Sequence, residues 1–213
     1  MKTIAGVWGL FVFAAGCAST GPQKITTTAV SITTVEQELS RAQDRGETCV
    51  TLLSTLIESP GPAFSDTYLK FVAALAQMDE QVQTLRDRAT AMDVRRDEYL
   101  QYWLEQTSGI QSPELRKEAE ARRTRLMESY LDLNARGAAL KRSYAPLHAS
   151  LHDCARFLAA DPRGTEAKAL AAELKKVLEG KKDVDAAAKD YRDGLKVILD
   201  KLSVPASSPP PEK

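Results

Sequence analysis

The sequence offers little of what enzyme active sites and metal centres are built from. It has two histidines and three cysteines in 213 residues, and aromatic residues make up 6% of it. It contains no glycine-rich phosphate loop, no nucleophile elbow and no set of metal ligands at an established spacing. Carboxylate pairs are plentiful, but they are expected on exposed helix faces, where nothing would perturb them. We therefore predict a non-enzymatic protein without a cofactor.

The chain also lacks an excess of charge of either sign. Lys+Arg and Asp+Glu both number 29, so the formal net charge is zero. Without a basic excess, neither nucleic acid nor an anionic lipid surface is predicted as a partner. The apolar run over residues 4–15 is too short to span a bilayer as a helix, because a span needs about 20 apolar residues.

Residues 1–16 have the pattern of a signal peptide: a positive start, a short apolar stretch and a small-residue end. The segment Phe13-Ala14-Ala15-Gly16-Cys17 resembles the lipobox of bacterial lipoproteins, although Ala14 stands where leucine is usual. The resemblance implies cleavage before Cys17, acyl chains on that cysteine and anchoring in the cell envelope. Ala18 in place of aspartate implies the periplasmic face of the outer membrane. The alternative is an ordinary secretory signal with an incidental cysteine.

Apolar residues recur every three or four positions along most of the remaining chain, which predicts four long helices. We expect these helices over about residues 33–58, 66–108, 112–160 and 165–202. Clusters of proline and glycine separate them, and Pro146 predicts a kink within the third. The threonine-rich stretch over 17–32 is predicted to be an irregular tether, reaching at most about 45–50 Å. Residues 203–213 are predicted to be a disordered tail.

Short turns make consecutive helices antiparallel neighbours. The predicted fold is therefore all-α, an elongated antiparallel helical bundle over residues 33–202. The second and third helices are the longest, at roughly 65–70 Å. Their hairpin around Gly109 is expected to project as a two-helix coiled coil. Charges enter the seam near its tip, at Arg96 and Arg122-Arg123.

Several segments, taken in order, resemble a family of short helical bacterial lipoproteins classed as a domain of unknown function. They are Tyr102-Trp103, Ser112-Pro113-Glu114-Leu115-Arg116, Tyr130, Ala145-Pro146-Leu147 and Phe157-Leu158. The resemblance spans most of residues 39–202. This chain departs from it at Ala159-Ala160-Asp161, where Lys-His-Asn is expected. The resemblance implies the helical architecture and carries no established activity.

Cys49 and Cys154 fall on core seams at similar depth in the predicted bundle. The compartment outside the inner membrane is oxidising, so a disulfide between them is one interpretation. Against it, the first and third helices are diagonal in a square bundle, and a bridge needs Cα atoms about 4.4–6.8 Å apart. The alternative is two small buried hydrophobic residues.

His148 and His152 are spaced to place two imidazoles on one metal ion. No HExxH glutamate accompanies them, so two histidines at the core boundary are the more ordinary interpretation. Tyr99, Tyr102 and Trp103 cluster near the projecting tip. They are either a partner contact or packing within the seam.

The sequence thus favours a lipid-anchored envelope protein with a structural or partner-binding role in the periplasm. Its expected partners are the membrane, through the lipid, and other envelope proteins. One alternative is a binding module that holds a small apolar ligand or a metal in the bundle. Another is an amphipathic helical protein that remodels membranes.

Overall fold

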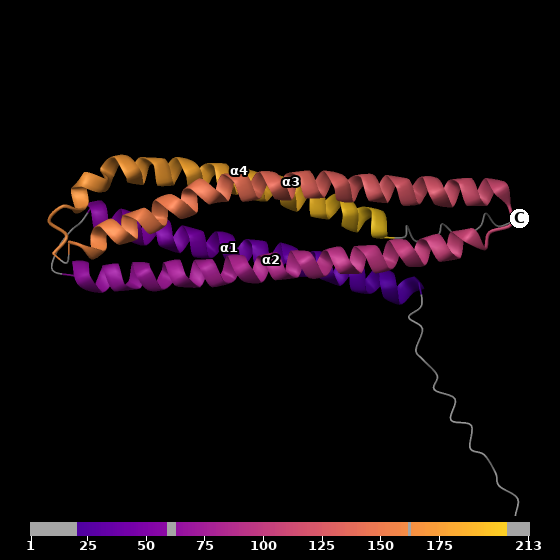
Figure 1. Cartoon of the computed structure of the whole chain (residues 1–213), viewed down its shortest axis with the longest axis horizontal. Coiled ribbons are helices and arrows are strands. Elements are labelled where there is room, and N and C mark those ends of the chain that lie inside the picture. The colour runs from indigo at the N-terminus through magenta and orange to yellow at the C-terminus, as the bar shows by residue number, and fades with distance from the viewer. Residues whose placement is uncertain (1–20, 59–62, 162, 204–213) are drawn as a thin grey trace, which may run out of the picture.

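The computed structural model describes residues 21–58, 63–161 and 163–203, and it confirms the predicted all-α helical bundle (Figure 1). The helices are α1 (Gly21–Glu58), α2 (Phe64–Ser108), α3 (Pro113–Ala159) and α4 (Ala171–Leu202), with a 3-10 turn at Ala167–Leu170 before α4. None of these helices combines the length and the apolar character needed to cross a membrane. The predicted signal peptide, Cys17 and the tail from residue 204 lie outside the described residues.

Helix α1 begins at Gly21, so the prediction of an irregular tether up to residue 32 is wrong. Ile25, Thr28 and Ile32 continue the three-four spacing of the apolar seam, and Thr28 and Ile32 are fully buried. Threonine is tolerated at position 28 because its hydroxyl donates to the carbonyl of Lys24, at 2.8 Å. A polar residue on the seam therefore concealed a spacing that was otherwise intact.

The bundle has two hydrophobic cores arranged along its length. The turn-end cluster lies beside the α1–α2 and α3–α4 connections and is built around Leu53, Phe71 and Leu151. The hairpin-end cluster lies toward the α2–α3 hairpin and is built around Ile32, Tyr130 and Ile198. Leu140 is partly buried and packs against both clusters.

The local signals at the helix ends explain where the chain turns. The Ser112 side chain accepts a hydrogen bond from the Leu115 amide, and Pro113 occupies the first position of α3. α3 then continues as one helix through Pro146. Gly164 has a φ of +68°, and the Phe64 ring packs directly over its α-carbon. A side chain at position 164 would meet both the ring and a left-handed backbone.

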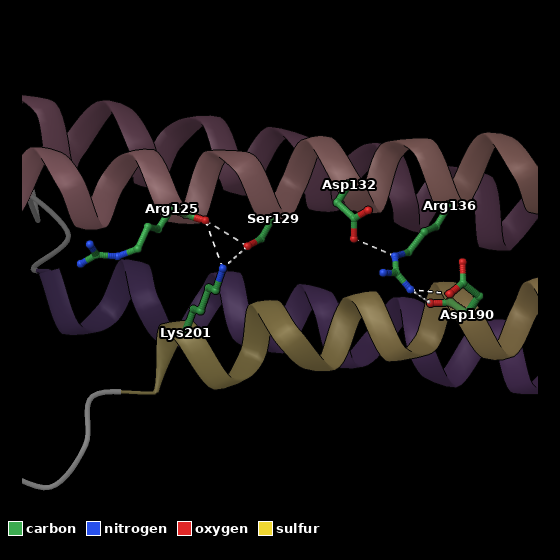
Figure 2. A network of polar contacts seen from close by, with 6 residues as sticks. All are labelled: Arg125, Ser129, Asp132, Arg136, Asp190 and Lys201. Atoms are coloured by element: carbon green, nitrogen blue, oxygen red, sulfur yellow. Dashed lines mark hydrogen bonds and ion pairs between the residues drawn. The ribbon is translucent and has the colours of Figure 1, made fainter.

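Polar contacts join α4 to α3 along the outside of the bundle (Figure 2). Arg136 of α3 pairs with Asp132 at 2.7 Å and reaches across to Asp190 of α4. Lys201 of α4 donates to the Arg125 carbonyl at 3.2 Å and to the Ser129 hydroxyl. α1 packs most extensively against α2, and α3 against α4, whereas α2 and α3 are the least extensively packed neighbours.

The α2–α3 hairpin runs past both the start of α1 and the end of α4 (Figure 1). Arg96, a charge on the seam near this end, is accommodated because it pairs with Asp93 at 2.6 Å and Asp97 at 2.8 Å. Its guanidinium also lies 5.7 Å from the centre of the Tyr130 ring.

Candidate functional site

A cavity of about 300 Å³ lies between the two hydrophobic clusters and is lined by all four helices. Its origin is visible in the side chains at that level of the bundle. Small residues face it from every helix: Ala42, Gly46, Ala89, Gly137 and Ala188. Side chains this short leave the centre unfilled, although well-packed cores have few voids larger than a water molecule.

Apolar side chains close the cavity at both ends. Met78 and Leu147 belong to the turn-end cluster, and Met92 and Leu133 belong to the hairpin-end cluster. Between these buried pairs, the lining residues Val82, Leu85 and Leu140 are only half-buried. These three belong to α2 and α3, so the apolar seam of this helix pair is incompletely covered beside the cavity.

The α1–α4 side of the cavity is closed by hydrogen-bonded side chains. Gln43 donates to Asp185 at 3.1 Å and accepts from Arg192 at 2.6 Å. Lys181 pairs with Glu47 at 3.2 Å and with Asp185. Burial lowers the pKa of Lys181, but its hydrogen bonds to Asp185 and Glu47 outweigh burial, and the net shift is upward. This wall therefore carries a charge that is already neutralised.

The α2–α3 side of the cavity has no such closure. Within residues 80–95 and 133–147, no described side chain makes a hydrogen bond or ion pair between α2 and α3. Arg86 of α2 and Lys141 of α3 are exposed lining residues on this side. Across the part of the chain that the structure describes, neither side chain has a hydrogen-bond or ion-pair partner.

Tyr144 contributes a further unused polar group to the lining. Its hydroxyl is buried without a hydrogen-bond partner among the described residues. Burial, with the charge of Asp79 nearby, raises the pKa of Tyr144 above its ordinary value, so the hydroxyl stays protonated. A buried hydroxyl left unpaired costs about 1–3 kcal/mol, and a polar atom within the cavity would recover part of that cost.

The two histidines singled out in the sequence meet a third residue, Asp79 of α2. His148 Nε2 lies 2.9 Å from one Asp79 carboxylate oxygen, and His152 Nε2 lies 3.1 Å from the other. The imidazole centres are 4.3 Å apart. Sequence analysis missed Asp79, because its pairing depends on how α2 and α3 align along the bundle axis.

Of the two interpretations of Cys49 and Cys154, the structure has the second: no disulfide is formed, and both are free thiols with no exposed surface. Both belong to the turn-end cluster, but their helices, α1 and α3, are diagonal and barely touch. Burial raises the pKa of Cys49 to about 12 and that of Cys154 to about 11, so both thiols stay protonated near neutral pH.

The three aromatic residues near the hairpin pack against the bundle itself. Tyr99 is buried, and its ring centre lies 5.7 Å from that of Trp103. Tyr102 lies against Gly21 at the start of α1, and Trp103 lies beneath the guanidinium of Arg122 at 5.6 Å. This packing accounts for the cluster, and its contact with a partner stays a prediction.

Comparison of the chain with protein-family models, with curated proteins and with solved structures gives no match. The resemblance to the family of helical lipoproteins therefore stays a prediction. The functional interpretation of the cavity and of the histidine pair therefore rests on their geometry alone.

Proposed function

We propose that this chain is a non-enzymatic binding protein of the cell envelope, anchored through Cys17, whose bundle holds a small amphiphile. The ligand has an apolar tail and an acidic head group. The observation that carries the proposal is the cavity of about 300 Å³, which has apolar walls from four helices and one side bordered by unpaired cations. The proposed location is the periplasmic face of the outer membrane, with other envelope proteins as partners.

The size and lining of the cavity favour an apolar tail. Ligand pockets typically enclose about 300–1,000 Å³ and are lined mainly by apolar side chains, and this cavity lies at the small end of that range. Each methylene group transferred from water into such a site contributes about 0.8 kcal/mol. The half-buried side chains Val82, Leu85 and Leu140 would become covered at the same time.

The charges at the open side favour an acidic head group. Arg86 and Lys141 border the cavity from opposite helices. A carboxylate or phosphate between them would accept charge-assisted hydrogen bonds, which are worth up to about 1 kcal/mol each at exposed side chains. Because the charge on Lys181 is already neutralised across the cavity, the α2–α3 side is the place for the head group.

Filling the cavity should weaken binding of the tail. We expect Ala89→Leu to weaken binding of decanoic acid at least tenfold, because the added carbons occupy the space between the clusters. Isothermal titration of the chain from Ala18 onward, which contains every described residue, measures this. Ala138→Leu is the matched control, since Ala138 is exposed on α3 and should bind as the unmodified chain does. Equal affinity in the two variants would contradict the proposed pocket.

Removing the two cations should affect the acid selectively. We expect the double variant Arg86→Gln/Lys141→Gln to lose about tenfold or more in affinity for decanoic acid. Its affinity for decanol, which has the same tail and no charge, should change by less than about twofold. Arg142→Gln removes a neighbouring exposed charge that does not line the cavity and serves as the control. A parallel loss for acid and alcohol would show that the cations do not bind the head group.

A further inference from the structure

Three side chains of types that bind metals converge where the first half of α2 lies beside the second half of α3. Asp79, His148 and His152 each offer a ligand atom, and these atoms all lie within 4.8 Å of one another. Two of them are imidazole nitrogens from successive turns of one helix, and the third is a carboxylate oxygen from its neighbour. We propose that this triad binds a divalent transition-metal ion, and that zinc fits its donors best.

The spacing of the donors is close to what zinc needs. Zinc lies about 2.0–2.2 Å from histidine nitrogen and carboxylate oxygen, so neighbouring ligands of a tetrahedral ion stand about 3.4 Å apart. The two Nε2–oxygen distances are 2.9 and 3.1 Å, each to a different oxygen of Asp79, and one ligand atom from each residue lies within 4.8 Å of the other two. Side-chain rotations that bring the three ligand atoms to about 3.4 Å from one another would admit the ion.

The donor chemistry of the triad suits a transition metal, with two imidazole rings whose centres lie 4.3 Å apart and one carboxylate beside them. A divalent ion would bind the lone pair of each Nε2, with the ring proton on Nδ1, so both imidazoles would bind as neutral ligands. Imidazole nitrogen also favours zinc, copper or nickel over calcium or magnesium.

The triad is open to solvent, and this allows an ion to enter. The side chains of Asp79, His148 and His152 are 38%, 39% and 29% exposed. Three protein ligands leave a fourth tetrahedral position for water or for a donor from another molecule. The rings are held in place from the protein side, because Tyr144 packs against His148 with ring centres 5.4 Å apart.

A metal here would join α2 and α3, the neighbouring helices that pack least extensively. Asp79 and His148 each adjoin a residue at one end of the cavity, Met78 and Leu147 respectively. The triad itself does not line the cavity. The test of the metal site is therefore independent of the test of amphiphile binding.

Zinc titration of the full chain after treatment with EDTA tests the site. We expect one zinc ion per chain, a rise in Tm with zinc concentration, and loss of both in the double variant His148→Gln/His152→Gln. Asp79→Asn should weaken zinc binding at least tenfold. Asp87→Asn, an exposed carboxylate on the same helix, should leave it unchanged. Absence of zinc binding, or binding that survives in the double histidine variant, would overturn the proposal.

A second measurement uses the protein without substitutions, so its result cannot be caused by a variant that fails to fold. The chain has only two histidines, so nitrogen NMR of ¹⁵N-histidine-labelled protein reports on this site alone. Zinc should shift both Nε2 resonances and leave both Nδ1 atoms protonated. Resonances unmoved by an equivalent of zinc would reject the site in the unmodified protein.

Discussion

Phe71→Ala should lower the free energy of unfolding by about 3–5 kcal/mol, the range for removing a large aromatic side chain from a closed core. Phe71 has no exposed surface and lies within the turn-end cluster. Its removal leaves a void that fixed helix backbones close only in part. Urea unfolding followed by circular dichroism of the helices measures the change.

The same measurement on Leu85→Ala separates a closed core from the wall of a cavity. Leu85 lines the cavity and is already half-buried, so its truncation creates little new void and should cost no more than about 1–2 kcal/mol. Leu131→Ala, at a position 66% exposed, is the surface control and should change stability by less than about 0.5 kcal/mol. If Leu85→Ala and Phe71→Ala cost the same, the centre of the bundle is packed and the cavity is absent in solution.

The helices were predictable because each depends on the spacing and end signals within its own segment of the sequence. The seam of α2 repeats every three or four residues, and Ser112-Pro113 marks the start of α3 with a cap and a proline. α1 was predicted too short because the stretch before residue 33 is rich in threonine. One of these threonines, Thr28, occupies a seam position between Ile25 and Ile32 and interrupts the apolar pattern although the helix continues.

The candidate sites were harder to predict because neither belongs to a single helix. The cavity arises where small residues such as Ala42, Ala89 and Gly137 fall at the same level of different helices. The triad needs Asp79 opposite His148 and His152 across the α2–α3 contact. Both depend on the axial alignment of helices, which turn lengths fix only to within about a turn of helix. Of these features, only the spacing of the two histidines could be recognised from the sequence.

The start of α1 at Gly21 changes the geometry of the proposed anchor. Gly21 lies four positions after Cys17, and even fully extended this stretch spans at most about 14 Å. Gly21 lies beside Tyr102, close to the projecting α2–α3 hairpin. A lipid on Cys17 would therefore hold the hairpin end of the bundle near the bilayer. Leu104 and Leu115 are exposed apolar side chains at that end.

Cys17→Ser should abolish incorporation of radiolabelled palmitate into the protein, because the modification requires the sulfur of that cysteine. The chain has two other cysteines, and both are fully buried, so Cys49→Ser/Cys154→Ser should keep the label in full. Mass spectrometry of the mature protein without substitutions should find an acylated Cys17 as its first residue. Label that persists without Cys17 would place the acyl chain on another residue and remove Cys17 as the proposed anchor. If the unsubstituted protein takes up no label, an ordinary secretory signal would explain residues 1–16.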